Sequence, residues 1–308
     1  MDSNAFPRKL ISESSILLAG PVRNVATQIE GEVKQLISSL NEFKNIFCLI
    51  VESDSDDGTC IKLEELSSII PNFSFITVGQ LSKSMPRRTD RIAHCRNLII
   101  EAVRSNLKYA TVDYIAMADM DGMNSLITRE KIAQCWTLSE PWDVITANQL
   151  DEYYDVWALS HPYWNPLDCW EQKQKLEKIL GHDAAEKIAI QCKQGAIDPG
   201  ANLIEVDSAF GGLAIYTRDA FLAGKYAGTD IENRGIDVAD HIPFHKELRK
   251  KGYRIFVNPA LINCSKYPAV KENTVAKPRN SLKLIQKLGV LLFGKHRFNK
   301  YLETLKSS

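Results

Sequence analysis

Two aspartates, Asp119 and Asp121, lie one residue apart at the end of an apolar run in YIAMADMDG, residues 114–122. In an extended segment their side chains point to the same side of the chain. Two such carboxylates can hold a hard divalent cation, Mn²⁺ or Mg²⁺, against phosphate oxygens. They can also form a phosphatase site, in which Asp119 attacks phosphorus and Asp121 moves a proton, or simply cap a turn. The pair alone leaves all three possibilities open.

Further polar residues follow other apolar runs or lie on a helix. Arg23 comes just after SILLAG (15–20), and an acidic turn at 52–57 follows NIFCLIVES (45–53). Arg91 and Arg96 lie in a predicted helix, from which their guanidinium groups can fork onto phosphate oxygens. The alternatives are an ordinary turn after a strand and a solvated helix face.

Strands and helices alternate in the part of the chain that would position these residues. Apolar runs predict strands at 15–20, 45–53, 73–79 and 113–119, and helical spacing predicts helices at 26–43, 60–70 and 91–106. This order is typical of a parallel sheet sandwiched by helices, which binds ligands at the carboxyl ends of its strands. Arg23, the acidic turn and the aspartate pair all fall there.

The second half of the chain is more mixed. We expect helices at 129–139, 171–180, 184–195 and 242–252, strands at 142–149 and 253–259, and a strand, a Gly-Gly turn and a strand within 203–217. Asp155 and Trp157 lie in a loop with five aromatic residues between 153 and 164. Such a loop can bind a sugar, or it can form a small hydrophobic core. Gly211 and Gly212 permit close approach of a sugar or acceptor, although a tight hairpin explains them equally well.

Four motifs occur in order within residues 15–265: ESDSDDGT (52–59), RIAHCRN (91–97), ADMDG (118–122) and YYDVW (153–157). Together they resemble the nucleotide-sugar transferases of the GT-A type, and more closely the fungal capsule-associated mannosyltransferase family and its bacterial relatives. The resemblance implies an α/β, GT-A-like fold with a Rossmann-type, mostly parallel central sheet flanked by helices and a mixed acceptor half. It implies one catalytic domain, 1–270, with a nucleotide-binding half at 15–125 and an acceptor half at 126–270.

The resemblance also implies residue roles. Nucleotide-sugar binding would fall to Arg23, Glu52, Asp54, Arg91, Arg96, Asn97 and Asp119, and Mn²⁺ or Mg²⁺ to Asp119 and Asp121. Asp240, at the start of the 242–252 helix, is the candidate base for the acceptor hydroxyl, with Asp237 the alternative. If the enzyme retains configuration, no such base is required. His241 and His245 are candidates for a hydrogen bond or a metal bond, although single histidines are more often structural.

The implied reaction is transfer of a sugar from a nucleotide donor to a glycan or lipid-linked glycan, in capsule or O-antigen polysaccharide synthesis. Two alternatives stay open. DMDG resembles the first motif of haloacid dehalogenase-like phosphatases, but that motif normally lies on the first strand of its domain. A catalytically silent glycan-binding module is the other alternative, and the intact acidic pair argues against it.

Charge and cysteine content bear on partners and location. Lys plus Arg equals Asp plus Glu, 38 each, so net charge gives no indication of nucleic-acid binding. Residues 271–308 form a basic amphipathic tail with nine Lys or Arg against two Glu, a net charge of +7. Within it, 277–301 can contact an anionic membrane surface, the body of the protein or a second subunit of a homo-oligomer. Seven scattered cysteines fit a reducing compartment, so we expect a cytoplasmic protein, at the inner face of the membrane if the tail binds lipid.

Overall fold

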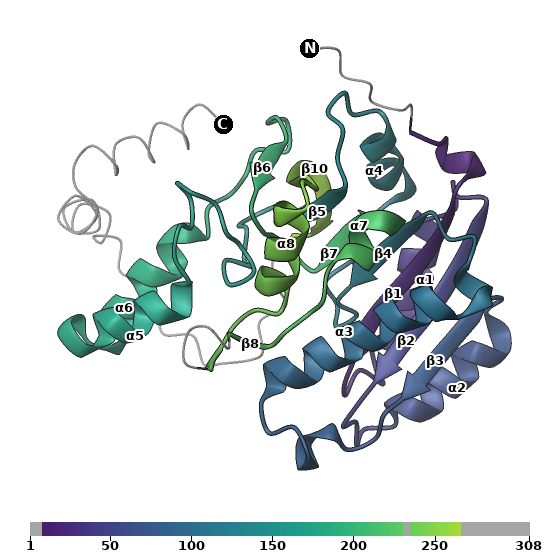
Figure 1. The fold of residues 1–308 in the computed structure, drawn as a ribbon, viewed down its shortest axis with the longest axis horizontal. Coiled ribbons are helices and arrows are strands. Elements are labelled where there is room, and N and C mark those ends of the chain that lie inside the picture. Colours follow the sequence, from purple (N-terminus) through teal and green to yellow (C-terminus); the bar gives the residue numbers. More distant parts are fainter. Residues whose placement is uncertain (1–7, 231–234, 266–308) are drawn as a thin grey trace.

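The computed structural model describes residues 8–230 and 235–265, in which helices cover an eight-stranded sheet (Figure 1). The strands of this sheet are β1 (Ser15–Val22), β2 (Asn45–Glu52), β3 (Phe73–Thr77), β4 (Tyr114–Ala118), β5 (Val144–Gln149), β6 (Ile204–Val206), β7 (Leu213–Thr217) and β10 (Ile255–Cys264). A separate two-stranded ribbon consists of β8 (Thr229–Asp230) and β9 (Ile236–Asp237).

The strand order is β3-β2-β1-β4-β7-β5-β10-β6. β3, β2, β1 and β4 are parallel, and β5 pairs in parallel with β10. β7 runs antiparallel between β4 and β5, and β6 runs antiparallel to β10. The predicted α/β class with a mostly parallel central sheet is therefore confirmed. The sheet continues through both predicted halves, and the division into halves stays a prediction.

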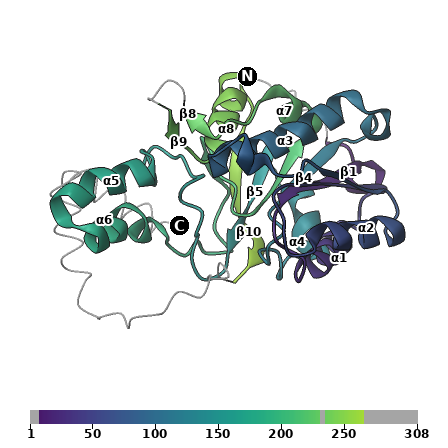
Figure 2. The same ribbon diagram turned by 90° about the horizontal axis from the view of Figure 1, so that it is seen from below.

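Helices cover both faces of the sheet (Figure 2). One face packs against α3 (Arg88–Ser105), α7 (Arg218–Ala223) and α8 (His241–Lys250), and the other against α1 (Ile29–Ser39), α2 (Thr59–Ile69) and α4 (Arg129–Ala133). α5 (Cys169–Leu180) and α6 (His182–Ala189) form a pair that projects away from the sheet. Short 3₁₀ turns occur at Ile11–Glu13, Leu81–Lys83, Leu107–Tyr109, Gln134–Trp136 and Gln191–Lys193.

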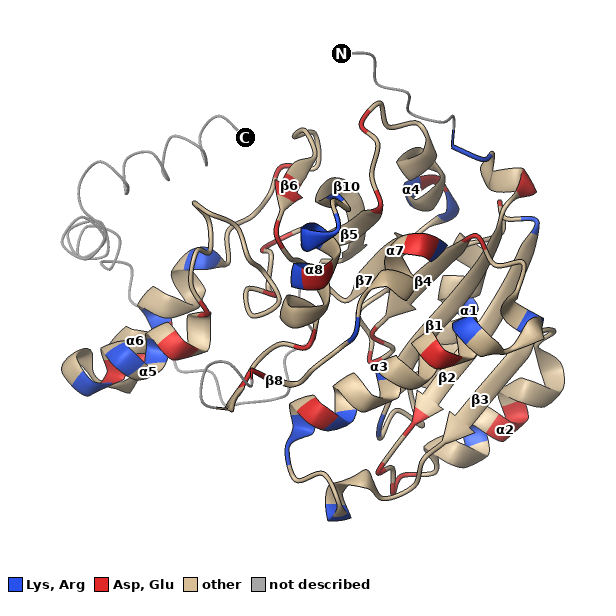
Figure 3. Cartoon of the chain, viewed as in Figure 1, with Lys and Arg blue, Asp and Glu red and all other residues tan. Residues whose placement is uncertain are grey.

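The environment of β1 explains why its sequence is continuously apolar and does not alternate between apolar and polar residues. Ile16 and Leu18 are buried against the α1 and α2 face, whereas Leu17 and Ala19 are buried against the α3 face. A parallel strand with helices on both sides buries every side chain, so a continuous apolar run is the expected pattern. The strands are accordingly almost free of charged residues (Figure 3).

The carboxyl ends of β1 and β4 approach each other unusually closely at Gly20. A Cβ atom added there would lie 2.2 Å from the main-chain oxygen of Ala118. The chain order also reverses here, because β2 and β3 lie on one side of β1 and β4 on the other. Open α/β sheets bind ligands outside such a reversal point.

Two predictions of the second half need comment. The expected strand–turn–strand at 203–217 is wrong as a hairpin, because β6 pairs with β10 while β7 inserts between β4 and β5. Asp240 does begin α8 as its N-cap.

In the described ranges no helix combines the length and apolar character needed to cross a bilayer. The predicted basic tail, 271–308, lies outside the described residues.

Candidate active site

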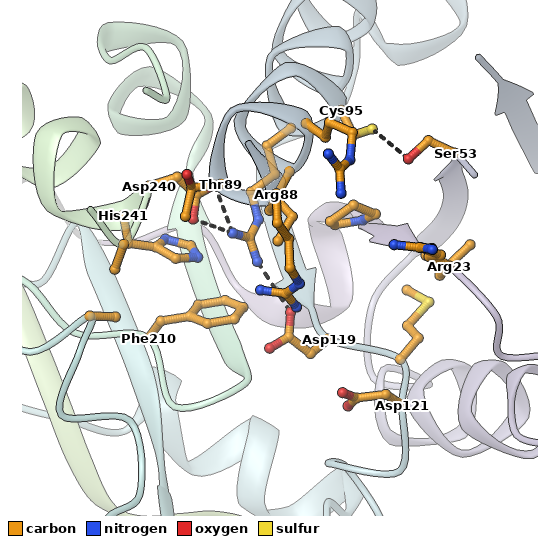
Figure 4. A pocket seen from close by; sticks show the side chains of 18 of the residues that line it. Arg23, Ser53, Arg88, Thr89, Cys95, Asp119, Asp121, Phe210, Asp240 and His241 are labelled. Carbon is orange, nitrogen blue, oxygen red and sulfur yellow. Dashed lines mark hydrogen bonds and ion pairs between the residues drawn. The ribbon is translucent and has the colours of Figure 1, made fainter. Parts of the chain in front are cut away.

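A cavity of about 480 Å³ opens at the carboxyl ends of β1, β2 and β4 (Figure 4). Its wall also includes the first turns of α3, the loop at 154–158 and the start of α8. The predicted site residues that line it are Arg23, Asp54, Arg91, Arg96, Asp119, Asp121, Asp155, Trp157, Asp240 and His241. Residues from both predicted halves thus meet in one space.

Arg96 is the centre of a buried charge network. Its Nη1 donates to both oxygens of Asp240, at 2.6 and 2.8 Å, and its Nη2 donates to Oδ1 of Asp119 at 3.1 Å. The side chains of Arg96 and Asp240 are only 4% and 8% exposed. Burial acts to lower the pKa of Arg96, but the two carboxylates outweigh it and raise that pKa. Both oxygens of Asp240 accept from the same Arg96 nitrogen, so the charges of this buried pair neutralise each other.

Asp119 is partly buried, with 31% of its side chain exposed, and Asp121 is exposed at the cavity. Burial raises the pKa of Asp119 to about 7, Arg96 opposes this shift, and the neighbouring carboxylates of Asp121 and Asp155 add to it. Burial also raises the pKa of Asp121, and the charge of Arg88 counteracts this effect. Two carboxylates whose pKa values are both raised form a site that a cation would stabilise.

Asp119 and Asp121 fit a divalent cation that is shared with a phosphate. Both line the cavity, and both offer the hard oxygen donors that Mn²⁺ and Mg²⁺ prefer. Among the described residues no group of three or more His, Cys, Asp or Glu side chains is placed to hold a metal. Mg²⁺ is usually held by one or two carboxylates together with substrate phosphates, so a phosphate ligand would complete the set.

The loops after β1 and β2 hold each other in place. Asn24 and Asp54 have left-handed φ values of 52° and 59°, which cost about 1–3 kcal/mol each unless local bonds stabilise them. Ser55 Oγ accepts from the Asn24 N–H, and Arg23 donates to the Asp54 carbonyl at 3.2 Å. Arg91 lies 3.4 Å from the Asp54 carboxylate. Burial acts to raise the pKa of Asp54, but the Ser82 N–H and these arginines outweigh it and keep the pKa low.

Five predicted residues do not line the cavity: Glu52, Asn97, Gly211, Gly212 and Asp237. Glu52 is 2% exposed and accepts from the Ser55 N–H and the Thr77 hydroxyl. Asn97 exchanges two 2.9 Å hydrogen bonds with the main chain of Tyr226. These two residues support the walls.

The remaining three of these residues contact protein. Asp237 is half-exposed and lies 3.5 Å from Arg87. The predicted close approach at Gly211 occurs, but to another strand, because a Cβ there would lie 2.5 Å from the main-chain oxygen of Ala147. A Cβ at Gly212 would lie 3.3 Å from atoms of Met123 and Asn263. The neighbours of both glycines are therefore parts of the protein.

A buried amide network below the cavity was not predicted. Asn124 Nδ2 donates to the main-chain oxygen of Asp119 at 2.6 Å and to Glu32 Oε2 at 3.1 Å. Gln149 and Asn263 both donate to the Gly211 carbonyl, at 2.9 and 2.8 Å. Asn124, Gln149 and Asn263 are fully buried, so their hydrogen bonds fix the aspartate turn relative to β5 and β10.

Asp155 is anchored by the main chain. Its oxygens accept from the Ala158 N–H at 3.3 Å and the Gly211 N–H at 3.0 Å. Burial raises the pKa of this carboxyl, and the two main-chain donors and Arg96 oppose the shift. No cation in the described part of the chain forms an ion pair with Asp155. A carboxylate with a raised pKa and free lone pairs is suited to proton transfer.

His241 is oriented by a hydrogen-bonded chain behind the wall. Ser208 donates to the Ala158 carbonyl at 2.7 Å, so its oxygen accepts from His245 Nδ1 at 2.9 Å. His245 Nε2 then accepts from the Tyr216 hydroxyl at 2.9 Å. The Tyr216 oxygen faces His241 Nδ1 at 3.5 Å, which places the His241 proton on Nδ1. Burial lowers the pKa of both histidines, to about 3 for His245, so both are neutral.

Sequence reasoning also missed Arg88, Thr89 and Phe210, which line the cavity. Phe210 stacks on His241 with a centroid distance of 3.9 Å, and the Arg96 guanidinium lies 5.0 Å from its centroid. The basic sequence PRRTDR (86–91), just before a predicted helix, was a signal that could have indicated Arg88. Phe210 carried no comparable signal, because only the fold brings it to the cavity.

No family model and no curated protein matches the chain. Solved structures with a similar fold include the mannosyltransferase PcManGT from Pyrobaculum calidifontis in complex with GDP-Man and Mn²⁺, at 14% identity and TM-score 0.48 over 96% of this chain and 76% of that chain. A second is S. aureus TarS 1–349 in complex with UDP-GlcNAc, at 11% identity and TM-score 0.44 over 94% of this chain and 71% of that chain. A third is S. aureus TarS 1–349, at 11% identity and TM-score 0.42 over 79% of this chain and 57% of that chain.

Proposed function

We propose that this protein is a glycosyltransferase that moves a sugar from a nucleotide-sugar donor to a glycan or lipid-linked glycan acceptor. The observation that carries the proposal is the Asp119–Asp121 pair in a cavity that four arginines also line, at the carboxyl ends of three parallel strands. A cation site and guanidinium partners for phosphates then share one space. A volume of about 480 Å³ is in the range of small-molecule sites.

The donor would lie across the first half of the cavity. Asp54, Arg23 and Arg91 form the wall on the β1 and β2 side, where the resemblance places the nucleotide. Mn²⁺ or Mg²⁺ on Asp119 and Asp121 would supply a Lewis acid for the leaving diphosphate. Arg96 holds Asp119 in place through the 3.1 Å bond, and Asp240 in turn holds Arg96.

The acceptor would enter from the side of the 154–158 loop. Tyr154, Trp157 and Phe210 provide aromatic surface for sugar rings there. In an inverting transfer the acceptor oxygen bonds to C1 of the donor sugar while the bond from C1 to the diphosphate oxygen breaks, with its electron pair leaving on the diphosphate. We assign the acceptor proton to Asp155 in place of the predicted Asp240, because the charge of Asp240 is neutralised by its buried ion pair with Arg96, whereas Asp155 has no ion-pair partner among the described residues.

A role in capsule or O-antigen synthesis and a cytoplasmic location at the membrane face are supported by the motif resemblance and by the charge of the tail. The proposed membrane or subunit contact at 277–301 lies outside the described residues. Binding of vesicles by the full chain and by a chain that ends at residue 270 would test it.

The first experiment is thermal stability against a panel of nucleotides and nucleotide sugars, with and without Mn²⁺. We expect a Mn²⁺-dependent rise with one class of donor, which Asp121→Ala abolishes. Asp183→Ala, which removes an exposed carboxylate on α6, is the matched control and should keep the rise. Donor turnover is then measured with candidate acceptors.

Other outcomes point to the alternatives. Hydrolysis of a generic phosphomonoester without any nucleotide response would replace the proposal by the phosphatase. Mn²⁺-dependent nucleotide binding with neither donor hydrolysis nor transfer would favour the silent binding module.

A further inference from the structure

Arg88 differs from the other arginines of the cavity in having no protein partner. Arg96 is paired with Asp240 and Asp119, Arg91 with Asp54, and Arg23 donates to a main-chain carbonyl. In the described residues Arg88 forms neither a hydrogen bond nor an ion pair, its side chain is exposed at the cavity, and its charge acts on Asp121. A guanidinium group carries five N–H donors in a planar fork. All five are therefore available to a ligand.

The same end of α3 carries further unsatisfied donors. Arg87 is the N-cap of this 18-residue helix and forms no side-chain capping bond. The first N–H groups of a helix lack partners within the helix and create a positive potential there. Thr89, the second helical residue, is 6% exposed and lines the cavity, and its hydroxyl has no partner among the described residues. Arg88 and Thr89 both belong to the cavity that holds Asp119 and Asp121 (Figure 4).

We infer that the start of α3, with Arg88 and Thr89, is the subsite for the diphosphate of the ligand. Helix N-termini bind phosphate through free N–H groups and the helix dipole, and arginine adds bidentate bonds. A simple carboxylate does not fit as well, because it has too few oxygens to reach the helix end and also share a cation with Asp119 and Asp121. A diphosphate can do both. This inference rests on the proposed function, and it locates the leaving group between two positive sources.

The subsite gives Arg88 a role in the transfer itself. As the bond between C1 and the diphosphate oxygen breaks, negative charge builds up on the diphosphate. A guanidinium group at the helix end stabilises that charge, so Arg88 would lower the barrier as well as bind the donor. Arg88 needs no large rearrangement to act, because no protein partner must first be displaced.

The test is titration calorimetry on the full chain with Mn²⁺ present. The ligands are inorganic pyrophosphate, the diphosphates UDP, GDP, CDP and ADP, and the corresponding nucleosides. Arg88→Ala should weaken diphosphate and pyrophosphate binding about tenfold to a hundredfold, as expected for the loss of one or two charge-assisted hydrogen bonds. Arg88→Lys should restore part of the affinity, and Thr89→Val should give a smaller loss. Nucleoside binding should not change.

Lys83→Ala is the matched control, because it removes one exposed positive charge five residues away that does not line the cavity. It should leave every affinity unchanged. Equal weakening of nucleosides and diphosphates by Arg88→Ala, or no weakening at all, would overturn the subsite. Failure of the wild type to bind any nucleotide, while pyrophosphate still binds through Arg88, would overturn the proposed function but keep the anion subsite. If the wild type binds neither nucleotides nor pyrophosphate, the proposed function and the anion subsite are both overturned.

Discussion

Two isosteric substitutions test the roles of Asp155 and Asp240 independently. Asp240→Asn removes the charge that balances Arg96, and Asp155→Asn removes the proposed proton acceptor. The two carboxylates differ in their partners: a guanidinium group for Asp240 and two main-chain N–H groups for Asp155. The first change should therefore act on stability and the second on turnover.

The expected loss for Asp240→Asn follows from the burial of the pair. Breaking a buried ion pair by removing one partner costs about 3–5 kcal/mol. Here Asp119 remains 3.1 Å from Arg96, and the amide keeps one acceptor oxygen, so we expect a loss of about 2–4 kcal/mol. Guanidinium chloride denaturation, with the transition midpoint and the m-value compared, measures it.

Asp155→Asn should leave stability nearly unchanged. Burial raises the pKa of Asp155 in the folded state, so its ionised form destabilises that state above its unfolded pKa. Neutralising it removes this cost, which offsets the loss of one of the two main-chain hydrogen bonds, since the amide keeps a single acceptor oxygen for Ala158 or Gly211. Loss of a general base lowers kcat by about 10²–10⁴.

The kinetic assay is donor turnover with the active acceptor, well below the unfolding temperature of each variant. Asp183→Asn on α6 serves as the control for both changes. The assignment would be refuted by the opposite pattern: Asp155→Asn with normal kcat, and Asp240→Asn with normal stability but a thousandfold lower kcat.

Two further predictions concern the aspartate pair. Mn²⁺ affinity should be constant above about pH 7 and fall by up to tenfold per pH unit below it, because protons compete for Asp119, whose pKa is raised to about 7. Calorimetry at pH 6, 7 and 8 measures this dependence. Equal Mn²⁺ affinities at the three pH values would contradict the prediction. Asn124→Ala should lower stability by about 1–3 kcal/mol, since it leaves the Asp119 carbonyl and Glu32 unpaired. It should also weaken Mn²⁺ binding although Asn124 does not line the cavity, and unchanged Mn²⁺ affinity would show that the aspartate turn needs no such support.

Much of the fold could be predicted because its first half depends on local patterns. Apolar runs and helical spacing identified β1 to β4 and α1 to α3 in the right order, and the polar residues after the strands led to the cavity. The insertion of β7 between β4 and β5 could not be found this way. The Gly211–Gly212 segment has the local sequence of a hairpin turn, and only long-range pairing directs its second strand into the middle of the sheet.

The sequence indicated which residues gather at the site but not which of them pair with one another. Arg96 and Asp240 were both identified, yet 144 positions separate them, and no pattern in the sequence indicates that one carboxylate neutralises the other. Glu52 and Asn97 show the converse case. Both belong to motifs that suggest ligand binding, but their side chains form hydrogen bonds within the protein and support the walls of the cavity.

Charge balance explains why pairing decides these roles. Four arginines and five aspartates line the cavity, and those that are buried, Arg96 and Asp240, require neighbours of opposite charge. Arg96 and Asp240 neutralise each other in an ion pair, and Arg91 and Asp54 lie close enough to form a second one. The charged groups of the lining without an ion-pair partner among the described residues are Arg23, Arg88, Asp121 and Asp155. A ligand that brings both negative charge and a bound cation neutralises Arg88 and Asp121 together. Asp155 then remains free to accept a proton, and group transfer from a diphosphate requires both functions.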